Sequence, residues 1–191
     1  MIQLNYINKD ILQAFEEDEI NVILHQCNCT VGMGAGLAKK IADKYPQVND
    51  FDKIMISNCK DTSLGIIKFG YADLIKLSET KHIWNIYSQW YKGSPSNNTF
   101  ISVFEMQDSF INRIIALKIA LKNVRANYHF KRDGDLTCET IKIGIPLIAS
   151  GLAKQKEYKY LSDLDYFKKF IEPIIIECFD NKIEELNIYY L

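Results

Sequence analysis

One stretch, residues 22–41, constrains the fold more than any other part of the chain. It begins as a short apolar run typical of a buried strand, and from Leu37 onward its apolar residues recur at helical spacing. Between these parts lie Gly32, Gly34 and Gly36, whose backbone can approach a ligand closely and point N–H groups at it. A helix that begins at such a loop adds unpaired N–H groups and the positive end of its dipole. This order of strand, loop and helix predicts an anion site, and phosphate is the favoured ligand.

A second loop of small residues, 149–153, follows another apolar run, residues 141–148. A near-continuous apolar run is typical of a strand buried on both faces of a parallel sheet. Ligands of open α/β sheets lie at the carboxyl ends of the strands, so we expect both loops to face one crevice. Two loops rich in N–H groups would clamp a diphosphate, with His25 and Asn28 near the group at its far end. The residues alone therefore predict a nucleotide-like diphosphate as ligand.

Apolar patterns elsewhere predict strands that alternate with helices. Further expected strands cover residues 2–7, 65–69, 72–77, 82–87 and 186–191. Expected helices cover residues 11–15, 35–45, 48–56, 110–124 and 164–175. Together these elements predict the α/β class: one domain over residues 1–191, folded as a three-layer α/β/α sandwich with a mixed central sheet.

The ends of these elements carry their own signals. Asp10 is a candidate cap for the first helix, Ser162 and Asp165 form a capping box, and Pro173 should kink or divide the last helix. Residues 88–99 are polar and contain two large aromatics, which predicts a loop that covers something, such as a lid. Residues 127–138 are charged and predict an exposed excursion.

The composition excludes several classes of protein. Of 191 residues, 48% are hydrophobic and 25% are charged, which argues against disorder. The net charge of −1 gives no strong nucleic-acid signal, and no run is long and apolar enough to cross a bilayer. We expect a soluble, cytoplasmic protein with no membrane partner, for which a monomer is favoured. The five cysteines form no zinc-binding spacing, so we expect reduced thiols, no metal and no cofactor.

Five motifs occur in order along the chain. They are Asp10-Ile11, His25-Gln-Cys-Asn-Cys, Gly32-Met-Gly-Ala-Gly-Leu-Ala, Ile145-Pro-Leu-Ile with Ala149-Ser-Gly-Leu, and Ile188-Tyr-Tyr-Leu191. Together they resemble the macrodomain family, and they are most similar to its branch of ADP-ribose-1″-phosphate phosphatases and phage relatives. The resemblance spans residues 2–191 apart from residues 91–106 and 127–139. It implies the macrodomain fold, with ADP-ribose lying across the crest of the sheet.

The resemblance also implies roles for single residues. Asp10 would accept a hydrogen bond from the adenine amino group beside the Ile11 backbone, and Tyr189 would stack near the adenine. Asn28 would hydrogen-bond the distal ribose. His25 matches a histidine thought to be catalytic in the phosphatase branch, where an imidazole activates water or protonates a leaving oxygen.

The two loops would hold the middle of the ligand. The first loop would wrap the distal ribose and its phosphate with Gly32, Met33, Gly34 and Ala35. The second loop would bind the diphosphate with Ser150, Gly151 and Leu152. The resemblance thus implies a small-molecule ADP-ribose derivative as partner and a metal-independent phosphatase, a hydrolase that converts ADP-ribose 1″-phosphate to ADP-ribose and phosphate.

The chain departs from the family pattern at several positions. Lys9 and Ala149 stand where glycine is frequent. Hydrolases of the family that remove ADP-ribose from glutamate or DNA carry an acidic residue at the position of Ala153 and a lysine near that of Gln89. Both absences weaken that activity, in which the lysine serves as nucleophile or electrostatic partner and the acid as base.

Two alternatives therefore stay open beside the phosphatase. One is a reader that binds ADP-ribose or a nucleotide signal without turnover, and the other is an ADP-ribosyl hydrolase acting on a macromolecule through other residues. At the level of single residues, His25 is equally compatible with a hydrogen-bonded structural histidine. Tyr189 is compatible with a plain sheet residue, and Trp90 and Tyr91 with packing under a long loop.

Overall fold

A computed structural model describes residues 2–29, 33–50, 68–91, 93–101, 106–129, 141–150, 153–179, 183 and 185–191. Six strands of these residues form one sheet: β1 (Gln3–Asn8), β2 (Val22–Asn28), β3 (Ala72–Lys76), β4 (His82–Gln89), β7 (Ile143–Pro146) and β8 (Glu185–Tyr190). Their order is β1-β8-β7-β2-β4-β3, and β3 runs antiparallel to β4 while the other neighbours are parallel. The sheet is therefore mixed, as predicted.

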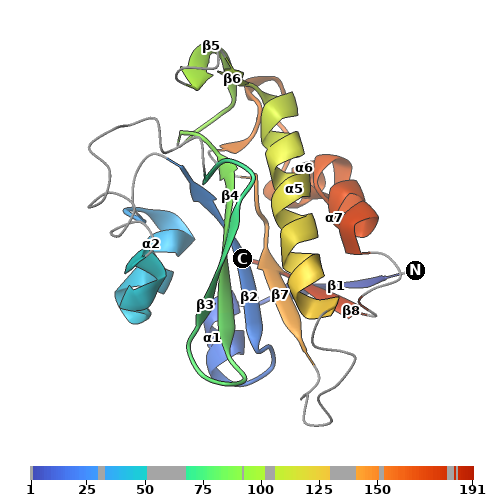
Figure 1. Ribbon diagram of the computed structural model, residues 1–191. Helices are drawn as coiled ribbons and strands as arrows, with labels where there is room; N and C mark the ends of the chain where they lie inside the picture. Colours follow the sequence, from blue (N-terminus) through green and yellow to red (C-terminus); the bar gives the residue numbers. More distant parts are fainter. Residues whose placement is uncertain are drawn as a thin grey trace.

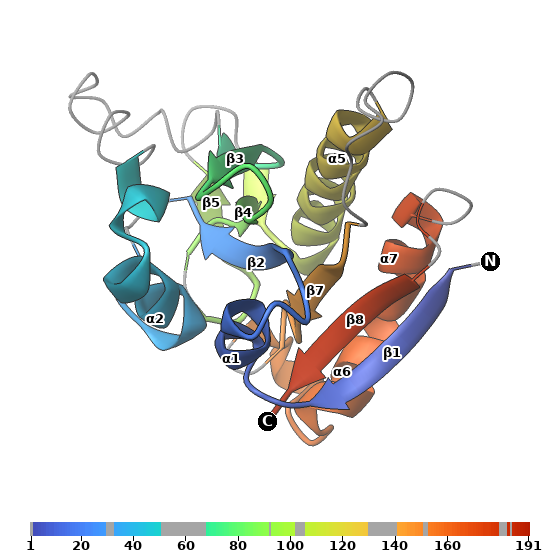
Figure 2. The same cartoon turned by 90° about the horizontal axis from the view of Figure 1, so that it is seen from below.

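Helices cover both faces of this sheet (Figures 1 and 2). One face carries α1 (Ile11–Glu16) and α2 (Gly36–Lys44), and the other carries α5 (Phe110–His129), α6 (Asp163–Phe170) and α7 (Glu172–Phe179). The predicted three-layer α/β/α sandwich is confirmed. Parallel strands need such crossover connections, and the crossovers place the helices on the two faces.

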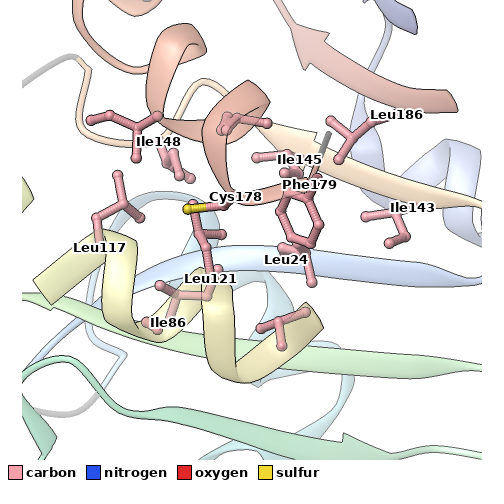
Figure 3. Close-up of a cluster of buried hydrophobic side chains, with 14 of the residues drawn as sticks. Leu24, Ile86, Leu117, Leu121, Ile143, Ile145, Ile148, Cys178, Phe179 and Leu186 are labelled. Carbon is pink, nitrogen blue, oxygen red and sulfur yellow. The ribbon is translucent and has the colours of Figure 1, made fainter. Parts of the chain in front are cut away.

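Two cores result, because successive side chains of a buried strand point to opposite faces. In β2, Leu24 packs under α5 and α7 with Leu121 and Phe179, as Figure 3 shows. Its neighbour Ile23 packs on the other face with Phe15 of α1. Both faces of β2 are buried, which explains why its sequence is a continuous apolar run.

The predicted helix ends are confirmed by hydrogen bonds. The Asp10 carboxylate accepts from the N–H of Leu12 at 2.8 Å and caps α1. The Ser162 hydroxyl accepts from the N–H of Asp165 at 3.0 Å and caps α6. Pro173 lies in the first turn of α7, and the predicted long helix is divided there into α6 and α7.

Parts of the sequence interpretation were wrong. The loop expected over 88–99 is partly strand: residues 88–89 end β4, and residues 96–99 belong to β5 (Ser96–Ile101), which pairs antiparallel with β6 (Met106–Asp108). Residues 68–70 form a turn instead of the end of a strand, since the N–H of Tyr71 donates to the carbonyl of Lys68 at 2.8 Å. Of the helix expected over 48–56, residues 48–49 end a short 3-10 helix, Pro46–Asn49, Asp50 has helical backbone, and residues 51–56 lie outside the described residues. Residues 127–129 still belong to α5, and the rest of that expected excursion, 130–138, lies outside the described residues.

Candidate functional site

The two small-residue loops follow neighbouring parallel strands, β2 and β7. The side chain of Gln26, near the end of β2, ties these strand ends together. Its Nε2 donates to the Ser88 hydroxyl of β4 at 2.9 Å, and its Oε1 accepts from the N–H of Ala149 at 2.8 Å. Sequence reasoning missed Gln26, because its partners are 62 and 123 residues away. The carboxyl ends of three strands are therefore held as one edge.

The first loop leads directly into α2. Met33 is half-buried against both the α1/α2 core and a small cluster around Trp90, while Gly34 and Ala35 are exposed. Ala35 is the N-cap and offers no side-chain acceptor to the first-turn N–H groups of α2. An uncapped helix start beside an open loop is a suitable place for an anion. Gly32 lies outside the described residues.

Hydrogen bonds connect the described residues of the second loop. The Ser150 hydroxyl donates to the carbonyl of Leu147, and the N–H of Ala153 donates to the carbonyl of Ser150 at 3.0 Å. Gly151 and Leu152 lie outside the described residues. Ala149 has a φ of 58°, in the left-handed region that favours glycine. The family pattern of glycine at this position thus has a visible conformational reason.

We expect Ala149→Gly to raise the free energy of unfolding by about 1 kcal/mol, since it removes left-handed strain that exceeds the entropy lost by a glycine. Urea denaturation of the purified protein measures this change. Ala153→Gly is the matched control and should lower stability, because Ala153 has no positive φ to relieve. A lower stability of Ala149→Gly would contradict the strain argument.

The expected adenine end lies at the ends of β1 and β8. The Asp10 carboxylate is already the cap of α1, and its Oδ2 lies 3.7 Å from Nζ of Lys40. Ile11 follows it with a buried side chain. Tyr189 is only 3% exposed and packs with the α1/α2 core, and burial raises the pKa of its phenol. A Cβ on Gly144 would overlap Cδ1 of Ile20 and lie 3.1 Å from this ring, so the glycine makes room for both side chains.

His25 lies inside the sheet layer, with 1% of its surface exposed. Its Nε2 is 2.7 Å from Oδ1 of Asn85, whose Nδ2 donates to the carbonyl of Val48 at 2.9 Å. The chain of contacts joins β2, β4 and the turn after α2. Burial lowers the pKa of His25 to about 4, so the imidazole is neutral at neutral pH. The structure shows a hydrogen-bonded, enclosed histidine.

Asn28 and Gln89 are partners at the ends of β2 and β4. The register skips Ser88, which makes a β-bulge at this point, and bulges often re-aim side chains next to sites. Gln89 Nε2 donates to the carbonyls of Tyr91 at 2.6 Å and Gly93 at 3.2 Å. The structure therefore brings Gln89 beside Asn28 and engages its side chain in the segment that follows β4.

A small cavity lies behind the second loop, with a volume of about 10 Å³, which is room for about one water. It is lined by residues of α5, the second loop and α6, among them Arg113, Ala149 and Ala153.

In the part of the chain that the structure describes, no three His, Cys, Asp or Glu side chains come together as metal ligands. Within the same residues no helix has the length and apolarity to span a membrane.

Comparison with known proteins shows the fold. No protein-family model matches the chain. An uncharacterized 17.5 kDa protein from the tk-vs intergenic region of Enterobacteria phage T4 is 28% identical over 90 residues, which are 47% of this chain. That match covers 56% of the phage protein, so it spans little more than half its length.

Solved structures match over the whole chain. The macrodomain of Mycobacterium tuberculosis DarG has a TM-score of 0.61 at 17% identity, with 100% of this chain and 99% of that chain covered. Thermosipho africanus DarTG, solved in complex with ADP-ribose, has a TM-score of 0.59 at 13% identity, with 100% of this chain and 42% of that chain covered. Likeness at such identities establishes a shared fold.

Proposed function

We propose that this chain, which has the macrodomain fold, binds ADP-ribose or a close derivative of it. The observation that carries the proposal is the convergence of two small-residue loops on the carboxyl ends of β2 and β7, tied together by Gln26. Ligands of open α/β sheets lie at such an edge. The five motifs that resemble the family, and the ADP-ribose bound by the Thermosipho protein of the same fold, support this ligand over other diphosphates.

The proposed ligand extends from the ends of β1 and β8 to the end of β4. Asp10, Ile11 and Tyr189 would contact the adenine, and Asn28 the distal ribose. The middle of the ligand would be held by Gly32, Met33, Gly34, Ala35, Ser150, Gly151 and Leu152. The burial of Tyr189, which is 3% exposed, limits its contact with a ligand, so Asp10 is the stronger adenine contact in this proposal.

A second proposal is that the bound substrate is ADP-ribose 1″-phosphate and that the protein hydrolyses it to ADP-ribose and phosphate. It rests on the His25 motif, in which His25 would serve in acid–base catalysis and Asn28 would orient the distal ribose. The structure supports binding better than hydrolysis, because the imidazole that would act as catalyst is enclosed and held by Asn85. Hydrolysis of ADP-ribosylated macromolecules ranks last, since Gln89 and Ala153 replace the expected lysine and acid.

Calorimetry with ADP-ribose tests the binding proposal, and Gly34→Glu makes the test specific for the site. We expect this substitution to weaken binding at least about a hundredfold, because its carboxylate would occupy the place of the ligand's phosphate and repel its charge. Ala126→Glu adds the same charge at an exposed position of α5 and should leave the affinity unchanged. Undiminished binding by Gly34→Glu would show that this loop is not the site.

An enzyme assay separates the remaining proposals. Purified protein is incubated with ADP-ribose 1″-phosphate in the presence of a chelator, and released phosphate is measured. Phosphate release that is lost in His25→Ala is the result expected of the phosphatase. Binding without turnover of phosphorylated or protein-linked substrates selects the reader, and full activity in His25→Ala would remove this histidine from the mechanism.

A further inference from the structure

We propose that the buried Arg113–Asp108 pair positions the distal-ribose end of the site. Arg113, from the first turns of α5, would act through the segment that follows β4, and not by touching the ligand. This inference rests on the proposed binding of ADP-ribose and names the part of the chain that determines how the distal ribose is held.

The pair joins the end of β6 to α5. Arg113 Nε donates to Oδ1 of Asp108 at 2.7 Å, and Nη2 donates to Oδ2 at 2.5 Å. Asp108 is 1% exposed and Arg113 is 6% exposed. A bidentate pair of this kind fixes the orientation of the guanidinium plane as well as its charge. The fork of Arg113 is therefore held in one direction.

The rest of the fork holds the backbone after β4. Arg113 Nη1 donates to the carbonyl of Gly93 at 2.7 Å, and Nη2 donates to the carbonyl of Tyr91 at 3.2 Å. The side chain of Gln89 donates to the same two carbonyls. Each carbonyl thus receives donors from β4 and from α5. This double attachment fixes the backbone after β4 at Tyr91 and at Gly93, beside the start of α5.

The same segment is attached to the first loop of the site. The N–H of Cys29 donates to the carbonyls of Gln89 at 2.9 Å and Trp90 at 3.3 Å. Cys29 directly follows Asn28, the residue proposed to hold the distal ribose, and Asn28 is paired with Gln89. A displacement of residues 89–93 would therefore move the backbone on which Asn28 and the first loop depend.

The residues proposed to contact the adenine lie on elements other than β4, β6 and α5. Asp10 caps α1 and Tyr189 belongs to β8, and in the sheet β7 and β2 lie between β8 and β4. A change at Arg113 should therefore affect contacts to the distal ribose and leave contacts to the adenine in place. This asymmetry distinguishes positioning from general loss of structure.

Arg113→Lys is the test, since lysine keeps the positive charge opposite Asp108 but lacks the planar fork that reaches both carbonyls. Calorimetry is run with ADP-ribose and with ADP, which lacks the distal ribose. We expect the Kd of ADP-ribose to rise about tenfold and that of ADP to change by less than about twofold, because misplacing a directional contact weakens only that contact. Arg125→Lys is the matched control, since Arg125 lies on the same helix and its Nη1 donates to the carbonyl of Cys178. It should change neither the Kd of ADP-ribose nor that of ADP.

Asp108→Glu gives a second measurement should Arg113→Lys fail to fold, because the longer side chain displaces the fork while both charges remain. It should show the same selective loss for ADP-ribose. Equal weakening of both ligands, or no weakening of either, would overturn the positioning role. Absence of ADP-ribose binding in the unaltered protein would overturn the proposed function, and the inference with it.

Discussion

Replacing Asp108 with alanine should lower the free energy of unfolding by about 3–5 kcal/mol, since it leaves the guanidinium of Arg113 buried without its counter-charge. A single domain is commonly stable by only about 5–15 kcal/mol, so the loss is a large share of the total. The remaining acceptors of Arg113, the carbonyls of Tyr91 and Gly93, carry no full charge and replace the carboxylate only in part.

Urea denaturation followed by circular dichroism measures this loss. Glu177→Ala is the matched control, because Glu177 also accepts from a cation, Lys118 at 2.6 Å, but on an exposed surface, where a pair contributes less than about 1 kcal/mol. The double variant Asp108→Leu with Arg113→Met should recover part of the loss, since no unpaired charge stays buried. A loss below about 1 kcal/mol in Asp108→Ala would show that the pair is better hydrated than its burial indicates.

Local signals predicted much of the fold. Asp10 and Ser162 were identified as caps because a side-chain acceptor before an apolar repeat satisfies the first N–H groups of a helix. The continuous apolar run at the start of β2 indicated a buried strand, and the structure confirms it, with one core on each face of β2. Such features depend on neighbours within a few residues, which is why a sequence displays them.

Other features depend on partners far along the chain. The sheet of β5 and β6 is built from a polar segment, and its two strands pair through an irregular register. The sequence therefore has no alternating pattern that predicts these strands. Gln26 and Arg113 show a similar limit, since Gln26 bonds residues 62 and 123 positions away and Arg113 bonds the carbonyl of Gly93, 20 positions away. A sequence shows that such polar side chains are present but does not show which groups they hydrogen-bond.

The candidate site divides in the same way. The order of strand, glycine loop and helix predicts an anion site, and the position of that loop at the strand ends follows from the topology. The chemistry is harder to predict, because it depends on whether a side chain is exposed. His25 is an example: its sequence position fits a catalyst, while its contacts are those of a structural residue. Its catalytic role stays a prediction.

Acid should destabilise the protein through the same histidine, with a loss of about 3 kcal/mol between pH 6.5 and pH 4. Burial lowers the pKa of His25 from 6.5 in the unfolded chain to about 4 in the folded protein. Between these values the unfolded chain binds more protons than the folded protein, so the free energy of unfolding falls as the pH falls. The contribution is complete above pH 6.5 and is lost once the pH reaches the folded pKa.

The difference between two proteins isolates this effect from all other titrating groups. His25→Gln keeps a side-chain N–H for Oδ1 of Asn85 but binds no proton, so the variant should lack this part of the pH dependence. Urea denaturation of both proteins at several pH values between 4 and 7 gives the two profiles, and from pH 7 to pH 4 the unaltered protein should lose about 3 kcal/mol more than His25→Gln. Parallel profiles would mean that His25 is not enclosed in solution. An accessible imidazole would then be free to meet a substrate, so this outcome would favour the phosphatase over the reader.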